Sequence, residues 1–312
     1  MRHKQATHDI DKGSESGTLG LDEAAKLIAK RAGYDIGTFA DEYTRQRLNR
    51  HLLDSQHQTS APLSSHRKIG QLSRQDVISA LSLNVTTMFR DPTFYSILRQ
   101  QVLPSLSRRK HLLIWEIGCS TGEESYSLAI TLNETGWANR YAIIATDFDS
   151  SAIEKARRGR YDIRKAGTFT RNYYTAEGQS TFSNYYSATS RYLDLDPLLR
   201  RSIFFREADV TKDRFNFRPD LIICRNVMIY FSRSQQLKTF NLLSRSLKEG
   251  GFLCIGSKEP VPTHSLEFQM REIAHGGRVF AVQRGRGTAP RLSSPQPIGC
   301  LNFRKNSPHQ KE

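Results

Sequence analysis

The sequence predicts an α/β protein in which a doubly wound, largely parallel sheet follows a small all-helical N-terminal domain. Short apolar runs recur from residue 112 onwards, and segments of helical length separate them. Strands that alternate with helices are typical of βαβ units, which build parallel sheets. Before residue 100 the sequence shows helical periodicity without a strand-like run. The 312 residues are enough for one large domain or two unequal ones.

The N-terminal third is predicted to be helical after a disordered lead. Residues 1–18 are polar and contain few apolar side chains, which is typical of disorder. Apolar residues at helical spacing predict helices over 21–32 and 41–53, and Ser73 is placed to cap a third helix. Residues 19–100 are therefore predicted to form a helical N-terminal domain and its linker.

The α/β domain is predicted to span residues 101–283. Its strands are expected at 112–117, 141–146, 203–205, 221–224, 252–255 and 278–283, and its helices at 123–132, 150–159 and 234–247. Continuous apolar runs of this length are typical of parallel strands buried on both faces. The alternation fails over 170–202, where Tyr, Ser and Thr are frequent, and a small β insertion is expected there. Residues 284–312 combine Gly, Pro and Ser with basic side chains and are expected to be a disordered basic tail.

The composition narrows the class of protein. Lys and Arg number 46 against 31 Asp and Glu, a net charge of +15 that would attract nucleic acid or an acidic protein alike. No run approaches the roughly 20 apolar residues of a membrane span, and no secretory signal is recognisable. The four cysteines lack C-x-x-C spacing. They are expected to be reduced thiols of a cytoplasmic protein without a metal site.

A glycine-containing turn joins the first predicted strand to its helix. Gly118 and Gly122 would let the backbone approach a ligand closely. Glu123 and Glu124 begin the helix, and two carboxylates at a helix N-terminus would repel phosphates. They suit a ligand with a cationic end, such as S-adenosylmethionine with its sulfonium and ammonium groups. A strand–turn–helix without any ligand would also account for the glycines.

Polar residues follow two further predicted strands. Asp147 ends the strand at 141–146 and could accept both hydroxyls of a ribose, or it could cap the next helix. Arg225 and Asn226 reach the carboxyl edge of the sheet, where ligands bind in open α/β folds. The Asn/Asp-Pro-Pro-Tyr motif of many amino-group methyltransferases is absent here, which disfavours transfer to nitrogen. Tyr230 is explained equally well as a packed aromatic.

Four motifs appear in a defined order along the chain. They are N-V-T-T-M-F-R at 84–90, S-T-G-E-E at 120–124, A-T-D at 145–147 and C-R-N-V-M-I-Y-F at 224–231. With them the chain, over residues 20–283, resembles the CheR-type chemotaxis receptor glutamate O-methyltransferase family. That family joins a helical N-terminal domain to a Rossmann-like S-adenosylmethionine-dependent methyltransferase domain with a small β insertion. The resemblance implies S-adenosyl-L-methionine as the cofactor.

The resemblance also implies roles for individual residues. The cofactor pocket would contain Asn84, Thr86, Arg90, Glu124, Asp147, Asp209, Val210, Arg225 and Asn226. Glu124 would contact the methionine part, Asp147 the ribose, and the Asp209-Val210 pair the adenine. Arg90 and Tyr230 would face the methyl-accepting carboxylate as catalytic residues. From its own sequence context alone, before an Asp-Pro helix breaker, Arg90 is better explained as an exposed arginine than as an active-site one.

The chain departs from the family pattern at three places. Ser125 stands where the family commonly has Pro, and Asp209-Val210 replaces Asn-Leu on the adenine side. Gly-Ser-Lys-Glu at 256–259 replaces Gly-His-Ser-Glu. This last change alters the charge near the substrate cleft and so bears on which protein is methylated.

The implied reaction converts glutamate side chains to methyl esters and needs little acid–base help, since glutamate, with a pKa of about 4.3, is already an anion at neutral pH. Arg90 would steer the carboxylate through a charge-assisted hydrogen bond, with Tyr230 sharing that role. The expected partners are acidic, glutamate-rich helices of a receptor or other protein. Arg45, Arg47 and Arg50 would bind these helices, and solvated surface charge explains the three arginines equally well.

Nucleic acid is not an expected partner, nor is membrane insertion, although a receptor would bring the enzyme near a membrane. Two alternatives remain at this point. The charge would suit an RNA methyltransferase, against which the Glu123-Glu124 pair and the motif at 224–231 argue. A non-catalytic regulator would bind S-adenosylmethionine without turnover.

Overall fold

The computed structural model describes residues 86–259, 261, 268–273 and 277–284. The predictions for the lead, for the helices before residue 86 and for the tail from residue 285 lie outside these residues. Asn84 and the arginines of the second predicted helix lie outside them as well.

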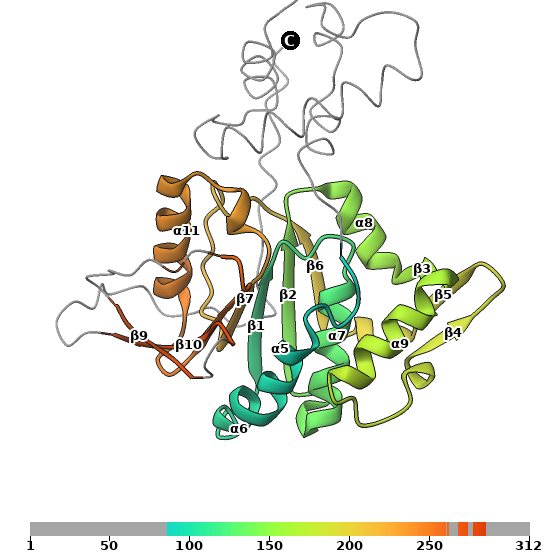
Figure 1. Ribbon diagram of the computed structural model, residues 1–312. Coiled ribbons are helices and arrows are strands. Elements are labelled where there is room, and N and C mark those ends of the chain that lie inside the picture. Colours follow the sequence, from blue (N-terminus) through green and yellow to red (C-terminus); the bar gives the residue numbers. More distant parts are fainter. Residues whose placement is uncertain (1–85, 260, 262–267, 274–276, 285–312) are drawn as a thin grey trace, which may run out of the picture. The chain divides into compact units, whose positions relative to one another are not determined.

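A seven-stranded sheet forms the centre of the described chain (Figure 1). Its strands are β1 (Leu112–Ile117), β2 (Tyr141–Asp147), β6 (Ile203–Glu207), β7 (Leu221–Cys224), β8 (Phe252–Ile255), β9 (Phe268–Glu272) and β10 (Val279–Arg284). They lie in the order β6-β2-β1-β7-β8-β10-β9. The first five in this order are mutually parallel, and β10 is antiparallel to β8 and β9. The predicted α/β class is confirmed.

Three helices between the strands, at 123–132, 150–158 and 233–246, lie within one residue of their predicted ranges. The longer helices are α5 (Pro92–Ile97), α7 (Glu123–Leu132), α8 (Ser150–Arg158), α9 (Ala166–Thr175) and α11 (Arg233–Ser246). Shorter turns of helix are η2 (Leu98–Val102), α6 (Leu103–Ser105), η3 (Asn133–Trp137), η4 (Ile163–Lys165), η5 (Phe182–Tyr185), α10 (Pro197–Arg200) and η6 (Met228–Tyr230). The α8 helix ends at Gly159, whose φ of 60° is the left-handed conformation that glycine adopts without strain.

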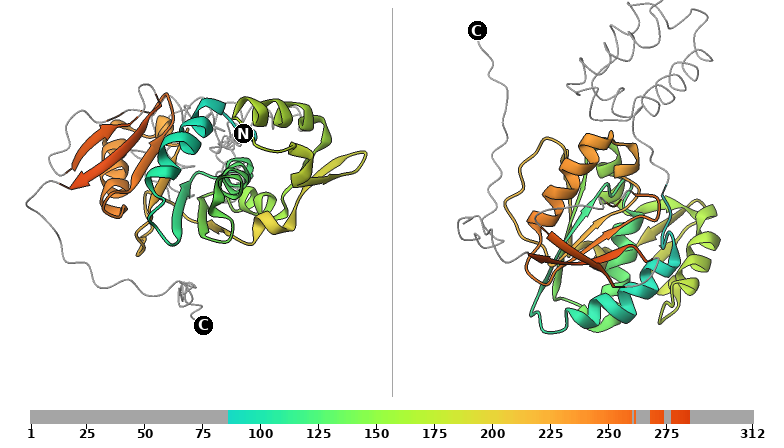
Figure 2. Two further views of the ribbon diagram at one scale, coloured as in Figure 1. Left: turned by 90° about the horizontal axis from the view of Figure 1, so that it is seen from below. Right: turned by 60° about the vertical axis from the view of Figure 1, so that its left-hand side comes forward.

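The strand order contains a switch point between β1 and β7. From β1 the chain passes through α7, β2 and α8 to β6 at one edge, and from β7 it passes through α11 to β8 in the other direction. Because parallel crossovers are right-handed, α7 and α8 cover one face of the sheet and α11 covers the other, as Figure 2 shows. Ligands of open α/β sheets bind outside the carboxyl ends of the strands at such a point. A ligand site is therefore expected at the carboxyl ends of β1 and β7.

The small β insertion is present, but its composition differs from the prediction. A three-stranded antiparallel sheet, ordered β3-β5-β4, contains β3 (Arg160–Asp162), β4 (Tyr186–Ala188) and β5 (Tyr192–Leu195). Its first strand begins before the predicted start at residue 170, directly after α8. Tyr173 and Tyr174, expected in the β insertion, lie in α9, where Tyr173 is buried. β-propensity depends on packing context, and here the helical packing of the tyrosine prevails.

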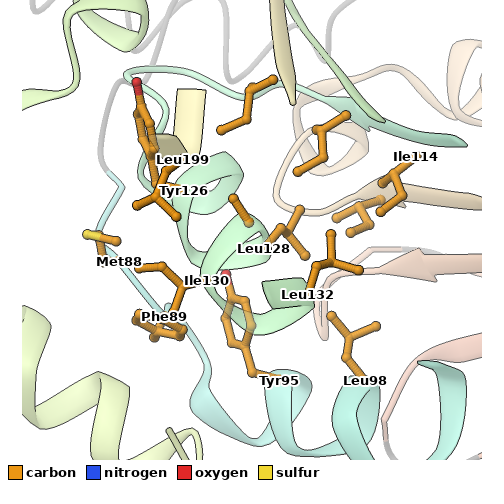
Figure 3. Close-up of a cluster of buried hydrophobic side chains, with 14 of the residues drawn as sticks. Met88, Phe89, Tyr95, Leu98, Ile114, Tyr126, Leu128, Ile130, Leu132 and Leu199 are labelled. Atoms are coloured by element: carbon orange, nitrogen blue, oxygen red, sulfur yellow. The ribbon is translucent and has the colours of Figure 1, made fainter. Parts of the chain in front are cut away.

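One hydrophobic core joins the sheet to the helices before and after β1 (Figure 3). It contains Phe89, Tyr95, Leu98, Ile114, Leu128, Ile130 and Leu132, all buried. On the opposite face of β1, Trp115 packs against Phe215 and Phe217, with ring centroids 4.4 and 5.2 Å away. Phe89 and the helix that follows it are thereby fixed to the α/β domain, which places the Thr86–Arg90 motif near the sheet.

A buried ionic network links the helices at the far end of α7. Arg99 Nη2 lies 2.5 Å from Glu134 Oε2, and both side chains are buried. Glu134 also accepts hydrogen bonds from the hydroxyls of Tyr173 and Tyr185. The network thus ties η2 and η3 to α9 and to the β insertion.

We expect Arg99→Met to lower the free energy of unfolding by about 3 kcal/mol, because it leaves the buried Glu134 carboxylate without its cation. Glu134 lies about 15 Å along the helix from Glu124, so cofactor affinity should be unchanged. Urea denaturation measures the first effect. Gln100→Ala is the control, because the neighbouring Gln100–Glu177 hydrogen bond is exposed. Equal denaturation midpoints for Arg99→Met and the wild type would contradict the account.

Candidate active site

The turn between β1 and α7 packs closely against the neighbouring strands. Gly118 and Gly122 have φ values of 72° and 92°, in the left-handed region that favours glycine. The backbone N–H groups of Gly118 and Cys119 donate to the carbonyl oxygen of Thr146, at 2.8 and 3.0 Å. A Cβ atom on Gly118 would lie 2.3 Å from Cγ2 of Val227. Only glycine therefore allows the turn to sit between the ends of β2 and β7.

Asp147, at the carboxyl end of β2, fastens this turn. Its carboxylate accepts hydrogen bonds from Ser120 N at 2.8 Å and from Asp149 N at 2.9 Å. Burial raises the pKa of Asp147 to about 6. Asp149 is the residue that caps α8, since its side chain accepts from Ser151 N and Ala152 N. The alternative that Asp147 serves as the helix cap is therefore wrong.

Arg225 is the centre of the site at the end of β7. Its side chain is buried, with Nη2 2.7 Å from Asp91 Oδ2 and Nη1 3.3 Å from Glu124 Oε2. The guanidinium carbon lies 4.2 Å from the centroid of the Phe94 ring, a cation–π distance. Nη2 also donates to the backbone carbonyl oxygen of Arg90 at 3.2 Å. One arginine thus joins the start of α5, the start of α7 and the end of β7.

Buried carboxylate oxygens without hydrogen-bond donors surround this arginine. Neither oxygen of Glu116, in β1, has a hydrogen-bond partner among the described residues, and the same holds for Glu124 Oε1. Burial first, and then the neighbouring Glu124, raise the pKa of Glu116 well above its ordinary value. Glu123 differs, because it lies within 2.5 Å of Thr121 Oγ1 and 3.2 Å of Lys165 Nζ. Buried carboxyl groups without donors are costly, so these oxygens suit a cationic ligand.

The predicted adenine-side pair lies one strand beyond Asp147. Ala208 N donates to the Asp147 carbonyl oxygen at 2.8 Å, which holds the chain after β6 beside the end of β2. The Asp209 carboxylate accepts from Thr211 N and Thr211 Oγ1, at 2.9 and 2.6 Å. Val210 is buried. The ends of β6, β2, β1 and β7 therefore carry the predicted site residues in one row.

The remaining predicted residues lie around the switch point. Thr86 and Arg90 are partly buried in the segment before α5, and the Arg90 backbone is tied to Arg225. Asn226 has a φ of 58°, so the chain turns sharply directly after Arg225. Tyr230 is partly buried and ends η6. The structure thus brings Arg90, Glu124 and Arg225 together, whereas Asn84 is outside the described residues.

Three residues of the site were not predicted: Asp91, Glu116 and Glu259. Asp91 was interpreted only as part of a helix-breaking Asp-Pro pair, and its pairing with Arg225 depends on tertiary contact. Glu116 carried a usable signal, because it is the one charged residue inside an otherwise apolar strand. Glu259, whose Oε1 accepts from Val227 N at 2.7 Å, lies far from its partner in sequence.

These residues fit S-adenosylmethionine. The glycine turn permits close backbone approach, and the unsatisfied oxygens of Glu116 and Glu124 suit the ammonium and sulfonium charges. The same carboxylates would repel a phosphate-bearing cofactor. In the described part of the chain, no group of three His, Cys, Asp or Glu side chains could hold a metal ion. None of the described helices is both long and apolar enough to cross a membrane.

We expect Glu116→Gln to stabilise the cofactor-free protein at pH 8 by about 1–2 kcal/mol and to weaken cofactor binding. A carboxyl group whose folded pKa is raised loses stability as pH rises from its unfolded pKa towards its folded pKa, and glutamine removes that loss. The difference in melting temperature between variant and wild type should therefore be larger at pH 8 than at pH 5. The exposed substitution Glu177→Gln is the control. A pH-independent difference would show that the pKa of Glu116 is not raised in the folded protein.

Comparisons with known proteins show that the chain is similar to methyltransferases. Residues 84–276 match the family model described as CheR methyltransferase, SAM binding domain. The chain is 34% identical over 204 residues to the putative methyltransferase Cher3 of Pseudomonas putida, covering 65% of this chain and 75% of that protein. It is 29% identical over 238 residues to a chemotaxis protein methyltransferase of Listeria monocytogenes, covering 76% and 88%. Chemotaxis protein methyltransferase 1 of Pseudomonas aeruginosa is 28% identical over 218 residues, covering 65% and 76%.

Proposed function

Because the chain belongs to the CheR methyltransferase family, we propose that it transfers the methyl group of S-adenosylmethionine to glutamate side chains of a protein, giving glutamate methyl esters and S-adenosylhomocysteine. The observation that carries the proposal is the buried Arg225, held between Glu124 and Asp91 at the switch point beside the unsatisfied carboxylate of Glu116. Such an arrangement would bind a cationic cofactor, with Arg90, whose backbone is hydrogen-bonded to Arg225, beside it.

Each part of the cofactor has residues suited to hold it. Glu124 and Arg225 would hold the amino and carboxylate groups of the methionine part, since one is an anion and the other a cation. Asp147 would accept from the ribose hydroxyls, and Asp209 and Val210 would lie beside the adenine. Thr86, Asn84 and Asn226 would complete the pocket. When bound, S-adenosylmethionine supplies a methyl group on a positively charged sulfur, which an anionic oxygen can attack.

The residues of the chain then have to place the acceptor rather than activate it. A glutamate carboxylate is ionised at neutral pH, so transfer to its oxygen requires no general base. Arg90 would orient the carboxylate by a charge-assisted hydrogen bond, and Tyr230 would share this role. In-line placement of oxygen, carbon and sulfur supplies up to about 7–11 kcal/mol when fully realised. Arg90 and Tyr230 are therefore the proposed catalytic residues.

The proposed substrates are acidic, glutamate-rich helices of chemotaxis receptors. Relatives named as chemotaxis protein methyltransferases support this assignment, and the net charge of +15 complements acidic helices. We propose a cytoplasmic enzyme that reaches the membrane surface only through its receptor. Nucleic acid fits less well, because the carboxylates at the site would repel its phosphates.

The experiment is incubation of the protein with methyl-labelled S-adenosylmethionine and a lysate or receptor fragment, followed by mild base. A glutamate ester releases its label as methanol, whereas methylated RNA or methylated amines retain it. Base-labile label on a protein band supports the proposal. Label on RNA would establish the alternative of an RNA methyltransferase, and cofactor binding without any transfer would establish a non-catalytic regulator.

A further inference from the structure

Glu259 is a buried carboxylate for which the proposed reaction has so far no use. It lies in the turn after β8 and is 1% exposed. Its Oε1 accepts the backbone N–H of Val227 at 2.7 Å. Val227 follows Arg225 and Asn226, which the proposed function assigns to the cofactor pocket. The carboxylate therefore holds the backbone of the segment that carries two pocket residues.

Gly256 leaves the space that the Glu259 carboxylate occupies. The register pairs Cys224 of β7 with Ile255 of β8, so Gly256 lies beside Arg225. A Cβ atom on Gly256 would lie 2.1 Å from Glu259 Oε2 and 3.1 Å from Asn226 N. The Glu259 side chain thus occupies the position that any side chain at 256 would take.

The backbone of Glu259 is held at both its N–H and its carbonyl group. Glu259 N donates to the Gly256 carbonyl oxygen at 3.1 Å, which closes a tight turn. The side chain of Arg278 donates to the Glu259 carbonyl oxygen. With its backbone fixed in this way, Glu259 can impose a position on Val227 rather than follow it.

A purely structural role is a poor explanation for this arrangement. Glu259 Oε2 has no hydrogen-bond partner among the described residues, and Glu124 adds a like charge nearby. Burial raises the pKa of Glu259 to about 6, so the group is ionised at pH 8 and costs stability there. The charge of Arg225 acts in the opposite direction and lowers the pKa of Glu259. Such a cost is typical of functional sites.

We propose that Glu259 is a positioning residue, which holds the turn after β7 in the conformation that presents Arg225 and Asn226 to the cofactor. Asn226 adopts a left-handed φ of 58°, a conformation that costs energy unless its surroundings impose it. The hydrogen bond to the next residue, Val227, supplies that constraint. The inference rests on the proposed roles of Arg225 and Asn226.

Calorimetry with S-adenosylhomocysteine at pH 8, on the full chain, tests this. We expect Glu259→Ala to weaken binding by about tenfold or more, since it removes a charge-assisted hydrogen bond that fixes the turn. Glu259→Gln keeps an acceptor oxygen for Val227 N and should bind within about threefold of the wild type. At saturating cofactor, the turnover of Glu259→Ala should fall less than its affinity. Lys258→Ala, an exposed change in the same turn, is the control.

The proposal is overturned if Glu259→Ala binds as tightly as the wild type, or if Glu259→Gln binds as weakly as Glu259→Ala. Should Glu259→Ala fail to fold, Glu259→Asp replaces it, because the shorter side chain keeps the charge but withdraws the acceptor oxygen from Val227 N. Weakened binding then supports the proposal and unchanged binding overturns it. The binding measurement needs no methyl acceptor, so it tests the role of Glu259 separately from the reaction. A wild type that binds S-adenosylhomocysteine but methylates no glutamate would contradict the proposed function and leave this inference standing.

Discussion

Arg90→Ala is expected to lower turnover by about 100-fold while changing cofactor affinity by less than about threefold. The change removes the guanidinium group proposed to orient the acceptor carboxylate, and a hydrogen bond to a charged group is worth about 1.5–3 kcal/mol. The backbone carbonyl oxygen of Arg90 accepts a hydrogen bond from Arg225, and this contact survives the substitution.

The measurement is steady-state methylation of a receptor fragment together with calorimetry of S-adenosylhomocysteine. The turnover of Arg90→Lys should fall between that of Arg90→Ala and that of the wild type, because lysine keeps the charge but lacks the planar set of donors of arginine. Arg108→Ala is an exposed change before the amino end of β1, at the opposite end of this strand from the site, and should leave both quantities unaltered. Unchanged turnover in Arg90→Ala would remove Arg90 from the mechanism.

Arg225→Met is expected to abolish measurable cofactor binding and to lower the free energy of unfolding by about 3–5 kcal/mol. The substitution leaves the buried Glu124 without its cation, and Glu116 lies close enough to raise the cost. It also removes the cation–π contact with Phe94. Asp91 contributes less to the loss, because its side chain is 54% exposed and solvent screens the pair.

Urea denaturation with and without S-adenosylhomocysteine measures both effects. The wild type should gain stability with ligand, whereas the variant should not. Asp91→Asn removes the ion pair with Arg225 on the Asp91 side alone. It should lower the free energy of unfolding by less than about 1 kcal/mol. A stable Arg225→Met variant that still responds to the ligand would show that the arginine is peripheral to the site.

Much of the α/β domain could be predicted because its signals are local. Continuous apolar runs indicated β1, β7 and β8, and the helix predicted over 150–159 is α8. β9 was not predicted, because its residues Phe-Gln-Met-Arg-Glu include neither a continuous apolar run nor a turn signal at their ends. The first strand of the β insertion was likewise missed, since three residues are too few to show a period.

The candidate site shows the same division between local and tertiary information. Asp147 and Arg225 were predictable because each directly follows a buried strand, and parallel strands end at one edge. The pairing of Arg225 with Asp91, and of Val227 with Glu259, joins residues distant in sequence. Such contacts follow from the strand order, which no local pattern specifies. The burial of Glu116 beside Glu124 is also a tertiary property.

The most direct test of the account is calorimetric titration of the full chain with S-adenosylhomocysteine, beside Arg225→Met and Asp147→Ala. We expect one binding site per chain in the wild type and strongly weakened binding in both variants, whose altered residues lie on either side of the glycine turn. A folded wild type that releases no heat with this ligand, or two variants that bind it normally, would contradict the placement of the cofactor at the ends of β2, β1 and β7.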